Sequence, residues 1–286
     1  MARRSPGRAG QTRGTPPRSS TPANTSRAPA SGAAGPRPAA THAPEPGSKS
    51  GLGYWLYGMH AASAALANPQ RAIHEILLTR EAQDALAARH VAISGSPSIV
   101  DRTRLDRLCE RDAVHQGIAL RVEPLNPPTI ADALLRPGPI LVLDQVTDPR
   151  NIGAILRSAA AFGACALLLQ DRNTPQESGA LAKAASGALE TVPVLREVNL
   201  SRSLASLQQA GLWVVGLDAG GGRLNGSAFE GRRVALVLGA EGAGLRRLTR
   251  ESCDEIASLY MPGDMESLNV SNAAAVALYE LARSNG

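Results

Sequence analysis

The sequence predicts an α/β protein built around a parallel β-sheet, and three observations lead to this prediction. Short, continuously apolar runs recur between helical patterns in the C-terminal half of the chain. A proline-rich stretch separates this half from a smaller segment that also alternates helical and strand patterns. The first fifty residues contain no Ile, Leu, Val or aromatic residue, so they cannot form a core. We therefore expect a disordered tail, a small α/β domain and a larger α/β domain.

The predicted disordered tail, residues 1–50, carries the basic charge of the protein. It holds 8 of the 30 Lys and Arg residues and one of the 25 acidic residues, which leaves 22 basic and 24 acidic residues for the rest of the chain. A flexible Arg-rich arm suits salt-dependent contact with phosphate backbones. A solubilising extension explains the same composition equally well, and a transit peptide shares the bias towards Arg and Ser.

The composition also excludes several classes of protein. No apolar run approaches the roughly 18 residues that span a bilayer, and no apolar segment typical of a secretion signal follows the basic residues. Cys109, Cys165 and Cys253 lie far apart without metal-ligand spacing, so we expect neither a disulfide framework nor a metal site. The sequence thus favours a cytoplasmic protein without a membrane partner.

Residues 54–123 are expected to form the small domain. Its segments alternate between helical spacing, as at Leu105, Leu108 and Cys109, and strand-like runs, as around Ile76. The expected elements are a helix at 58–67, a strand at 72–79, a helix at 82–89, a strand at 91–94, a helix at 101–111 and a strand at 117–122. Residues 124–138 are expected to be a linker, because prolines remove backbone donors and disfavour helix before them.

Residues 139–286 are expected to form the larger domain. Its apolar runs are hydrophobic on both faces, as central strands of a helix-covered parallel sheet are. The expected strands are 140–143, 166–169, 192–195, 212–217, 234–238 and 256–260. The expected helices are 152–162, 178–189, 201–210, 245–253 and 270–284. Ligands bind at the carboxyl ends of such strands, so we expect the site in the loops after Leu143, Leu217, Leu238 and Tyr260.

The loop after Leu143 leads to Asn151 and Arg157. Asn151 stands at the predicted start of a helix, where it acts either as a helix cap or as a site residue. Arg157 lies in an otherwise apolar run, and a buried charge is costly unless it meets an anion or forms hydrogen bonds. This placement favours a functional role for Arg157.

The loop after Leu238 is glycine-rich and contains Glu241. It lacks both the phosphate-binding Lys-Ser/Thr and the dinucleotide fingerprint, and a carboxylate among the glycines would repel phosphate. Glycines can instead bring backbone groups close to a flat, neutral ligand such as adenine.

The third loop carries Ser267 and Asn269 into the last helix. Four of the six residues 267–272 bear hydroxyl or amide groups, which is more than helix capping requires. Capping and a role in a binding site are both compatible with this segment.

These three segments, in this order, resemble the three motifs of the SpoU (TrmH-like) RNA ribose 2′-O-methyltransferases of the SPOUT superfamily. The matching residues are Asn151-Ile152-Gly153 with Arg157-Ser158-Ala159, then Gly239, Glu241, Gly242, Gly244 and Leu245, then Ser267-Leu268-Asn269-Val270-Ser271. The resemblance extends over residues 54–284, because the segments at 57–61 and 114–117 look like the small RNA-binding domain of the rRNA guanosine methyltransferases in this family. The family usually has Ile-Pro-Met before its third motif, whereas this chain has Leu259-Tyr260-Met261-Pro262.

The resemblance implies a SPOUT-type parallel sheet with a C-terminal trefoil knot, and methyl transfer from S-adenosyl-L-methionine to a ribose 2′-OH. It implies that five residues contact the cofactor: Leu217, Gly239, Leu259, Met261 and Leu268. It also implies an RNA substrate, with a guanosine of 23S rRNA favoured over tRNA, and a homodimer that packs through the last helix. The apolar face of that helix is equally compatible with the protein's own core.

The implied catalytic residues are Asn151, Arg157, Glu241, Ser267 and Asn269. A guanidinium keeps its proton to very high pH, so we expect Arg157 to clamp the target phosphate and 2′-oxygen, held by Asn151 and Glu241. Glu241 is an alternative acceptor of the 2′-OH proton, and Ser267 and Asn269 would position the ribose and the charged end of the cofactor. Two competing hypotheses are an inactive RNA-binding ribosome assembly factor and an α/β dehydrogenase, the latter disfavoured by the missing fingerprint.

Overall fold

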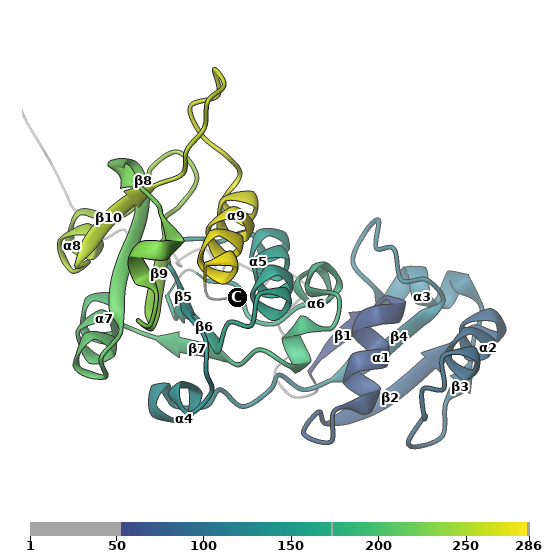
Figure 1. Ribbon diagram of the computed structural model, residues 1–286. Helices are drawn as coiled ribbons and strands as arrows, with labels where there is room; N and C mark the ends of the chain where they lie inside the picture. The colour runs from purple at the N-terminus through teal and green to yellow at the C-terminus, as the bar shows by residue number, and fades with distance from the viewer. Residues whose placement is uncertain (1–52, 173, 285–286) are drawn as a thin grey trace, which may run out of the picture. The chain divides into compact units, whose positions relative to one another are not determined.

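The computed structural model describes residues 53–172 and 174–284, and within them it contains two β-sheets (Figure 1). The expected tail at 1–50 lies outside the described residues. We call the four-stranded sheet with its helices, residues 54–122, the four-stranded module. We call the six-stranded sheet with its helices, residues 140–283, the six-stranded module. The described helices include none that is long and apolar enough to cross a membrane.

The four-stranded module has the strand order β1-β4-β2-β3. Its strands are β1 (Tyr54–Tyr57), β2 (Ile73–Leu78), β3 (Ser98–Ile99) and β4 (Ile118–Val122). Its helices are α1 (Met59–Ala67), α2 (Arg80–Ala88) and α3 (Arg102–Leu108). Strand β4 runs antiparallel to both β1 and β2, while β3 runs parallel to β2 at the edge.

The strand expected at 91–94 is wrong. His90 adopts the left-handed conformation with φ 56°, and the Val91 amide donates to the Leu86 carbonyl, so this segment ends α2 and pairs with no strand. Val91 and Ile93 still pack against the core, which explains their apolar character. Strand β1 was not predicted, although three of its four residues are aromatic, because it is short and lies next to the tail boundary.

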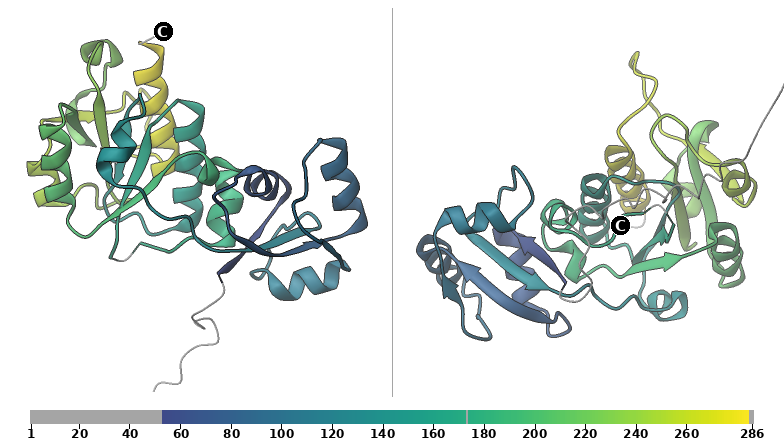
Figure 2. Two further views of the ribbon diagram at one scale, coloured as in Figure 1. Left: turned by 90° about the horizontal axis from the view of Figure 1, so that it is seen from below. Right: turned by 180° about the vertical axis from the view of Figure 1, so that it is seen from behind.

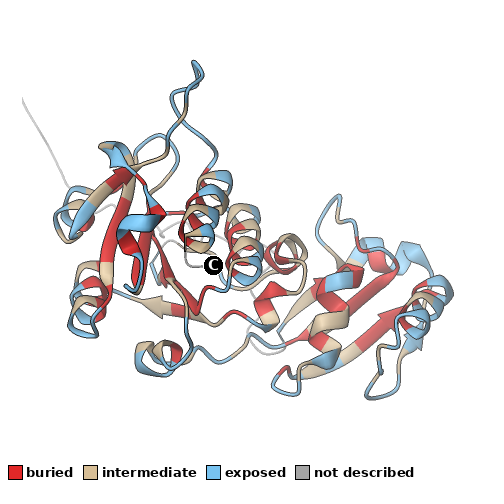
Figure 3. Ribbon diagram, in the orientation of Figure 1, coloured by how far each residue is buried: buried red, intermediate tan, exposed pale blue. Residues whose placement is uncertain are grey.

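The six-stranded module has a wholly parallel sheet, as the sequence predicts, and its strand order is β10-β8-β9-β5-β6-β7. Its strands are β5 (Ile140–Leu143), β6 (Ala166–Gln170), β7 (Val194–Glu197), β8 (Trp213–Arg223), β9 (Val234–Leu238) and β10 (Glu255–Ser258). The central strands β5 and β9 are buried along their whole length (Figure 3). Continuous apolar strands of this kind are typical of sheets covered on both faces.

Helices cover both faces of the six-stranded sheet (Figure 2). Helices α5 (Pro149–Ala161), α6 (Gly179–Ala185) and α9 (Val270–Arg283) contribute to the larger core cluster on one face. Helices α4 (Ile130–Leu134) and α7 (Leu200–Gln209) contribute to a second cluster, and α8 (Arg247–Glu251) is a short helix beside α7. Two 3₁₀ helices, Ala188–Glu190 and Gly226–Phe229, complete the module.

Three predicted elements differ clearly from the structure. The strand expected at 212–217 continues as β8 to Arg223, so Leu217 lies within a strand and not before a loop. The helix expected at 178–189 breaks after α6, because Ser186 and Gly187 both have positive φ angles, of 53° and 97°. The stretch expected to be a linker at 124–138 contains α4, whose start is fixed by a capping box between Thr129 and Asp132.

Candidate functional site

Three neighbouring strands and the loops after two of them form one pocket. Residues 217–219 within β8, the loops after β9 and β10, and the start of α9 line a cavity of about 240 Å³. All five residues expected to contact a cofactor line it: Leu217, Gly239, Leu259, Met261 and Leu268. The carboxyl ends of parallel strands therefore supply the pocket, as expected for this kind of sheet.

The lining of the pocket fits a ligand that is partly apolar and carries positive charge. Leucine and methionine side chains alternate with the carboxylates of Asp218, Glu241 and Glu266. The described residues of this lining include no Lys or Arg, so the pocket offers nothing to neutralise a polyphosphate. This composition agrees with the argument from the sequence against a nucleotide triphosphate.

The glycine-rich loop closes tightly on itself. A Cβ atom at Gly239 would lie 2.2 Å from the Gly244 carbonyl carbon, and the Gly244 amide donates to the Ala240 carbonyl at 3.0 Å. A side chain at position 239 is therefore incompatible with this backbone, and the loop presents backbone atoms to the pocket.

Asp144 anchors the far end of this loop and was not singled out from the sequence. It is fully buried at the end of β5, and its carboxylate accepts hydrogen bonds from the Arg246 amide at 3.1 Å and Nε at 2.6 Å. A carboxylate directly after a buried strand was the available signal, because such a group needs partners. Asp144 thus connects the loops after β5 and β9.

Asn151, Glu241 and Asn269 meet at the pocket. The Oε1 atom of Glu241 accepts from the Asn151 amide at 3.0 Å, the Asn269 amide at 2.6 Å and the Val270 backbone amide at 3.4 Å. The Asn269 amide also lies 3.1 Å from the Asn151 Oδ1 atom. The structure therefore brings one residue from each of the three predicted motifs into a single hydrogen-bonded cluster.

Asn151, Ser267 and Asn269 differ in whether they cap a helix. Asp148 caps α5 by accepting from the Arg150 amide, so the interpretation of Asn151 as a cap is wrong and its side chain is free to reach Glu241. Asn269 does cap α9, accepting from the Ser271 amide at 2.9 Å, while its amide group donates to Glu241. Ser267 caps nothing; it is exposed and lines the pocket. Asn269 alone therefore has both roles.

Arg157 differs from its expected environment. It is exposed, and among the described residues it has no hydrogen-bond or ion-pair partner, so the expectation that Asn151 and Glu241 hold it is wrong. The apolar run around Arg157 suggested that this residue is buried. Part of the run consists of alanines on the exposed side of α5, because Ala160 and Ala161 are exposed while Ile155 is buried. Arg157 is consequently available to an external anion.

Within the described ranges, no group of three or more His, Cys, Asp or Glu side chains could hold a metal ion.

Comparisons with known proteins match this chain over both modules. Residues 138–279 match the SpoU rRNA Methylase family, and residues 55–128 match the family described as RNA 2′-O ribose methyltransferase substrate binding. The chain is 43% identical over 239 residues to the 23S rRNA (guanosine-2′-O-)-methyltransferase RlmB of Ralstonia nicotianae, covering 80% of this chain and 94% of that protein. It is 38% identical over 245 residues to the enzyme of the same name from Escherichia coli, covering 80% and 97%.

The fold matches a solved structure as well. The SpoU methyltransferase AviRb from Streptomyces viridochromogenes, whose crystal structure is in complex with AdoMet, superposes with a TM-score of 0.67 at 24% identity, over 80% of this chain and 89% of that one. At this identity the likeness concerns the fold. Taken with the identities above, these matches show that the chain belongs to the SpoU rRNA methylase family.

Proposed function

We propose that this protein transfers a methyl group from S-adenosyl-L-methionine to the 2′-OH of a ribose in RNA, specifically a guanosine of 23S rRNA. One observation carries the proposal: Asn151, Glu241 and Asn269, one from each motif, meet beside a pocket lined by all five expected cofactor residues. The names of the relatives at 43% and 38% identity support the rRNA substrate.

The pocket fits S-adenosyl-L-methionine by its chemistry. The closed backbone of the Gly239 loop suits a flat adenine, and Leu259 and Leu268 supply apolar contact. The exposed Glu266 carboxylate suits an ammonium or hydroxyl group, whereas Asp218 is already paired with Arg250. When bound, the cofactor supplies an activated methyl group on a positively charged sulfur.

The cluster suits the handling of the ribose hydroxyl. The three hydrogen bonds to Glu241 all reach Oε1, and within the described residues none reaches Oε2. The amides of Asn151 and Asn269 thus orient the carboxylate, and Oε2 is left to take the 2′-OH proton. Ser267, exposed at the rim of the pocket, would position the ribose.

Arg157 would clamp the RNA rather than act as a base. Its guanidinium holds its proton to very high pH, and in its exposed position it can reach a phosphate or the 2′-oxygen. Its lack of protein partners supports this role, because the donors are not otherwise used.

The remaining expectations form part of the same proposal. We assign residues 54–123 to an RNA-binding domain and residues 139–286 to a catalytic domain with a trefoil knot, joined through 124–138. The close packing of the loops after β9 and β10 around one pocket supports the knot. The function places the protein in the cytoplasm, where ribosomal RNA is the partner.

A homodimer through α9 is proposed on a smaller surface than the sequence suggested. Of the apolar face expected to pack on a second copy, Ala274, Ala277, Leu278 and Leu281 are buried in the protein's own core. Val276 and Tyr279 remain 47% and 56% exposed. Sedimentation of the wild type and of Tyr279→Glu tests the dimer: a monomeric wild type contradicts it.

Mapping 2′-O-methyl groups in 23S rRNA and tRNA, with and without this gene, tests the function. We expect one guanosine of 23S rRNA to lose its methyl group when the gene is removed and to regain it with the purified protein and cofactor. Loss of a tRNA methyl group instead would favour the tRNA alternative. Unchanged maps, with no cofactor binding by calorimetry, would favour the inactive assembly factor.

A further inference from the structure

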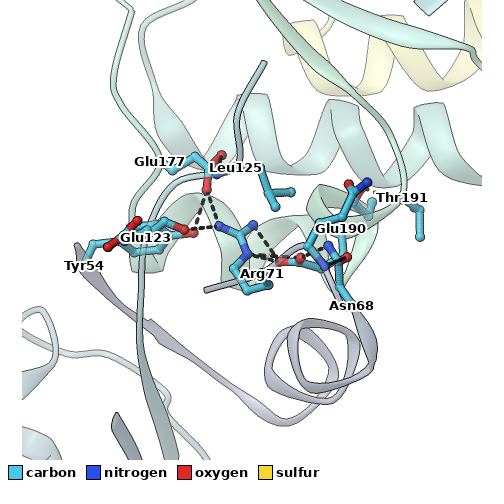
Figure 4. Close-up of polar contacts among 10 residues, drawn as sticks. Tyr54, Asn68, Arg71, Glu123, Leu125, Glu177, Glu190 and Thr191 are labelled. Atoms are coloured by element: carbon cyan, nitrogen blue, oxygen red, sulfur yellow. Dashed lines mark hydrogen bonds and ion pairs between the residues drawn. The ribbon is translucent and has the colours of Figure 1, made fainter. Parts of the chain in front are cut away.

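Arg71 lies at the centre of a buried polar cluster that joins the two modules (Figure 4). Its side chain has no exposed surface, and it contacts the carboxylates of Glu177, 10% exposed, and Glu190, 3% exposed. Its Nη1 atom donates to the Glu177 carboxylate at 2.9 Å and to the Glu123 carbonyl at 2.6 Å, and Nη2 donates to Glu190 at 2.7 Å. The planar fork of the guanidinium therefore makes contacts in three directions.

One guanidinium and two carboxylates give the cluster a net negative charge. Neutral hydrogen-bond donors stabilise the two carboxylates. The Tyr54 hydroxyl donates to Glu177 at 2.9 Å, the Leu125 amide donates to Glu177 at 3.1 Å, and the Asn68 amide donates to Glu190 at 2.7 Å. Burial and the neighbouring Glu177 carboxylate raise the Tyr54 pKa far above its usual value, so its hydroxyl remains a donor. Each side-chain nitrogen of Arg71 and each carboxylate oxygen of Glu177 and Glu190 thus has at least one hydrogen-bond partner within the protein.

The two carboxylates come from either end of one short segment. Glu177 precedes α6, and Glu190 ends the 3₁₀ helix that follows it. Tyr54, Asn68 and Arg71 come from the four-stranded module. Arg71 therefore holds α6 at both ends against the other module.

Helix α6 packs closely against both the four-stranded module and α5, the helix that bears the site residues. A Cβ atom at Gly179 would lie 2.1 Å from the ring of Tyr57 in β1. A Cβ atom at Gly153 of α5 would lie 2.5 Å from the Leu181 carbonyl of α6. Helix α5 carries Asn151 and Arg157, so α6 is packed directly between β1 and the helix of the candidate site.

Stability alone is a weak reason for such a cluster. Replacing a buried ion pair by well-packed apolar residues is often neutral or stabilising, whereas its directional hydrogen bonds select one arrangement. We propose that the Arg71 cluster sets the orientation of the four-stranded module on the catalytic module, so that RNA bound by the first presents its target ribose to Arg157 and Glu241. Arg71 is then a positioning residue, and this role rests on the proposed RNA methyl transfer.

The test compares full-length wild type with Arg71→Lys, which keeps the charge but loses the fork, and Glu190→Gln. His74→Gln is the matched control, because it removes an exposed pair with Glu123 at the same side of the four-stranded module. Each variant is assayed for thermal unfolding, cofactor affinity, and methyl transfer to a long folded 23S rRNA fragment and to a short oligonucleotide with the same target guanosine. Hydrogen exchange of the Leu125 amide, which is bonded to Glu177, reports the cluster directly.

We expect Arg71→Lys and Glu190→Gln to bind the cofactor within about 2-fold of wild type, and to lose roughly 10-fold or more in kcat/KM on the long RNA. The loss should lie mainly in KM and be below about 3-fold on the short RNA, which does not need both modules. Faster exchange at Leu125 should accompany it, and His74→Gln should change none of these quantities.

Equal losses on both RNAs, or unchanged kcat/KM on the long RNA despite faster exchange at Leu125, would overturn the positioning role. If the wild type itself transfers no methyl group, the proposed function fails. In that case, hydrogen exchange at the Leu125 amide and affinity for the long RNA test the orienting role of Arg71. This role is rejected if neither quantity changes in Arg71→Lys.

Discussion

Two arginines show how differently the two polar regions of this molecule are built. Arg71 is buried and has its guanidinium surrounded by two carboxylates and a carbonyl, while Arg157 is exposed and, among the described residues, unpaired. A buried charge without partners is very costly, so the junction between the modules must satisfy every donor within the protein. An exposed charge can leave its donors free for a substrate. The arginine of the structural cluster is thus paired within the protein, whereas the arginine of the candidate site is not.

The largest effect is expected at Glu241, the carboxylate that holds the cluster together and that we propose takes the proton of the ribose hydroxyl. Glu241→Gln keeps an acceptor for the Asn269 amide but cannot take a proton, so methyl transfer should fall by roughly 10²- to 10⁴-fold. Cofactor affinity should stay within a few-fold, measured by calorimetry beside radiolabelled methyl transfer. Turnover within about 3-fold of wild type would remove Glu241 as the proton acceptor.

Breaking the buried cluster should cost stability. Arg71→Met leaves Glu177 and Glu190 without their counter-charge, and the free energy of unfolding should fall by about 3–5 kcal/mol. The exposed pair removed in His74→Gln should change it by less than about 1 kcal/mol. Denaturant unfolding of both variants measures these free energies. Equal losses would contradict the structural role of the Arg71 cluster.

Arg157→Ala should show the opposite behaviour from Arg71→Met. The exposed, unpaired side chain contributes little to folding, so the melting temperature should not change measurably. Turnover should fall by about 10²-fold, because a donor aimed at developing charge is lost. A clear fall in melting temperature, or unchanged turnover, would contradict the assignment of Arg157 as an RNA clamp.

A side chain in the glycine-rich loop should weaken cofactor binding. Gly239→Ala places a Cβ atom 2.2 Å from the backbone of Gly244, so the loop must shift and cofactor affinity should fall by about 10-fold or more. Gly222→Ala is the control, because its Cβ would meet nothing within 4 Å. Similar affinity of both variants, measured by calorimetry, would show that the loop does not contact the cofactor.

The smallest effect concerns one thiol in each module. Burial raises the pKa of Cys109 and of Cys253 to about 11, from an ordinary value of 9.0. Folding therefore favours the protonated thiols, and their contribution to stability is present below pH 9 and is lost as the pH rises from 9 to 11. Both groups are partly exposed, so each loss should be about 1 kcal/mol or less. Cys109→Ala and Cys253→Ala should each flatten the decline in urea unfolding measured between pH 8 and pH 11.

Prediction from the sequence was most accurate where burial alone decides the structure. The strands at 140–143 and 234–238 match β5 and β9 residue for residue, because a strand covered on both faces must be apolar throughout. It was less accurate where backbone conformation decides. The break in the helix after α6 depends on the left-handed Ser186, which no hydrophobic pattern records.

The candidate site shows the same division. Its residues could be named because they carry amide, carboxylate and guanidinium groups at the carboxyl ends of strands. Which of them contact one another could not be derived, because this depends on the direction of individual helix faces. The cap that was one of two interpretations of Asn151 is in fact provided by Asp148, and Arg157 was expected among partners that it does not contact. The Arg71 cluster escaped notice, because its members lie in five separate segments of the chain.

The strand order of the six-stranded sheet has a consequence for how the protein is made. Strand β5 lies between β6 and β9, and its pairing of Ile140 with Ala235 joins residues that are far apart in sequence. Closing so long a loop must precede the gain from the pairing, which slows folding. On the ribosome, strands β1 to β4 emerge and can pair among themselves well before β9 and β10 appear. The pocket, whose walls come from β8 and from the loops after β9 and β10, is thus completed later in synthesis than the four-stranded module.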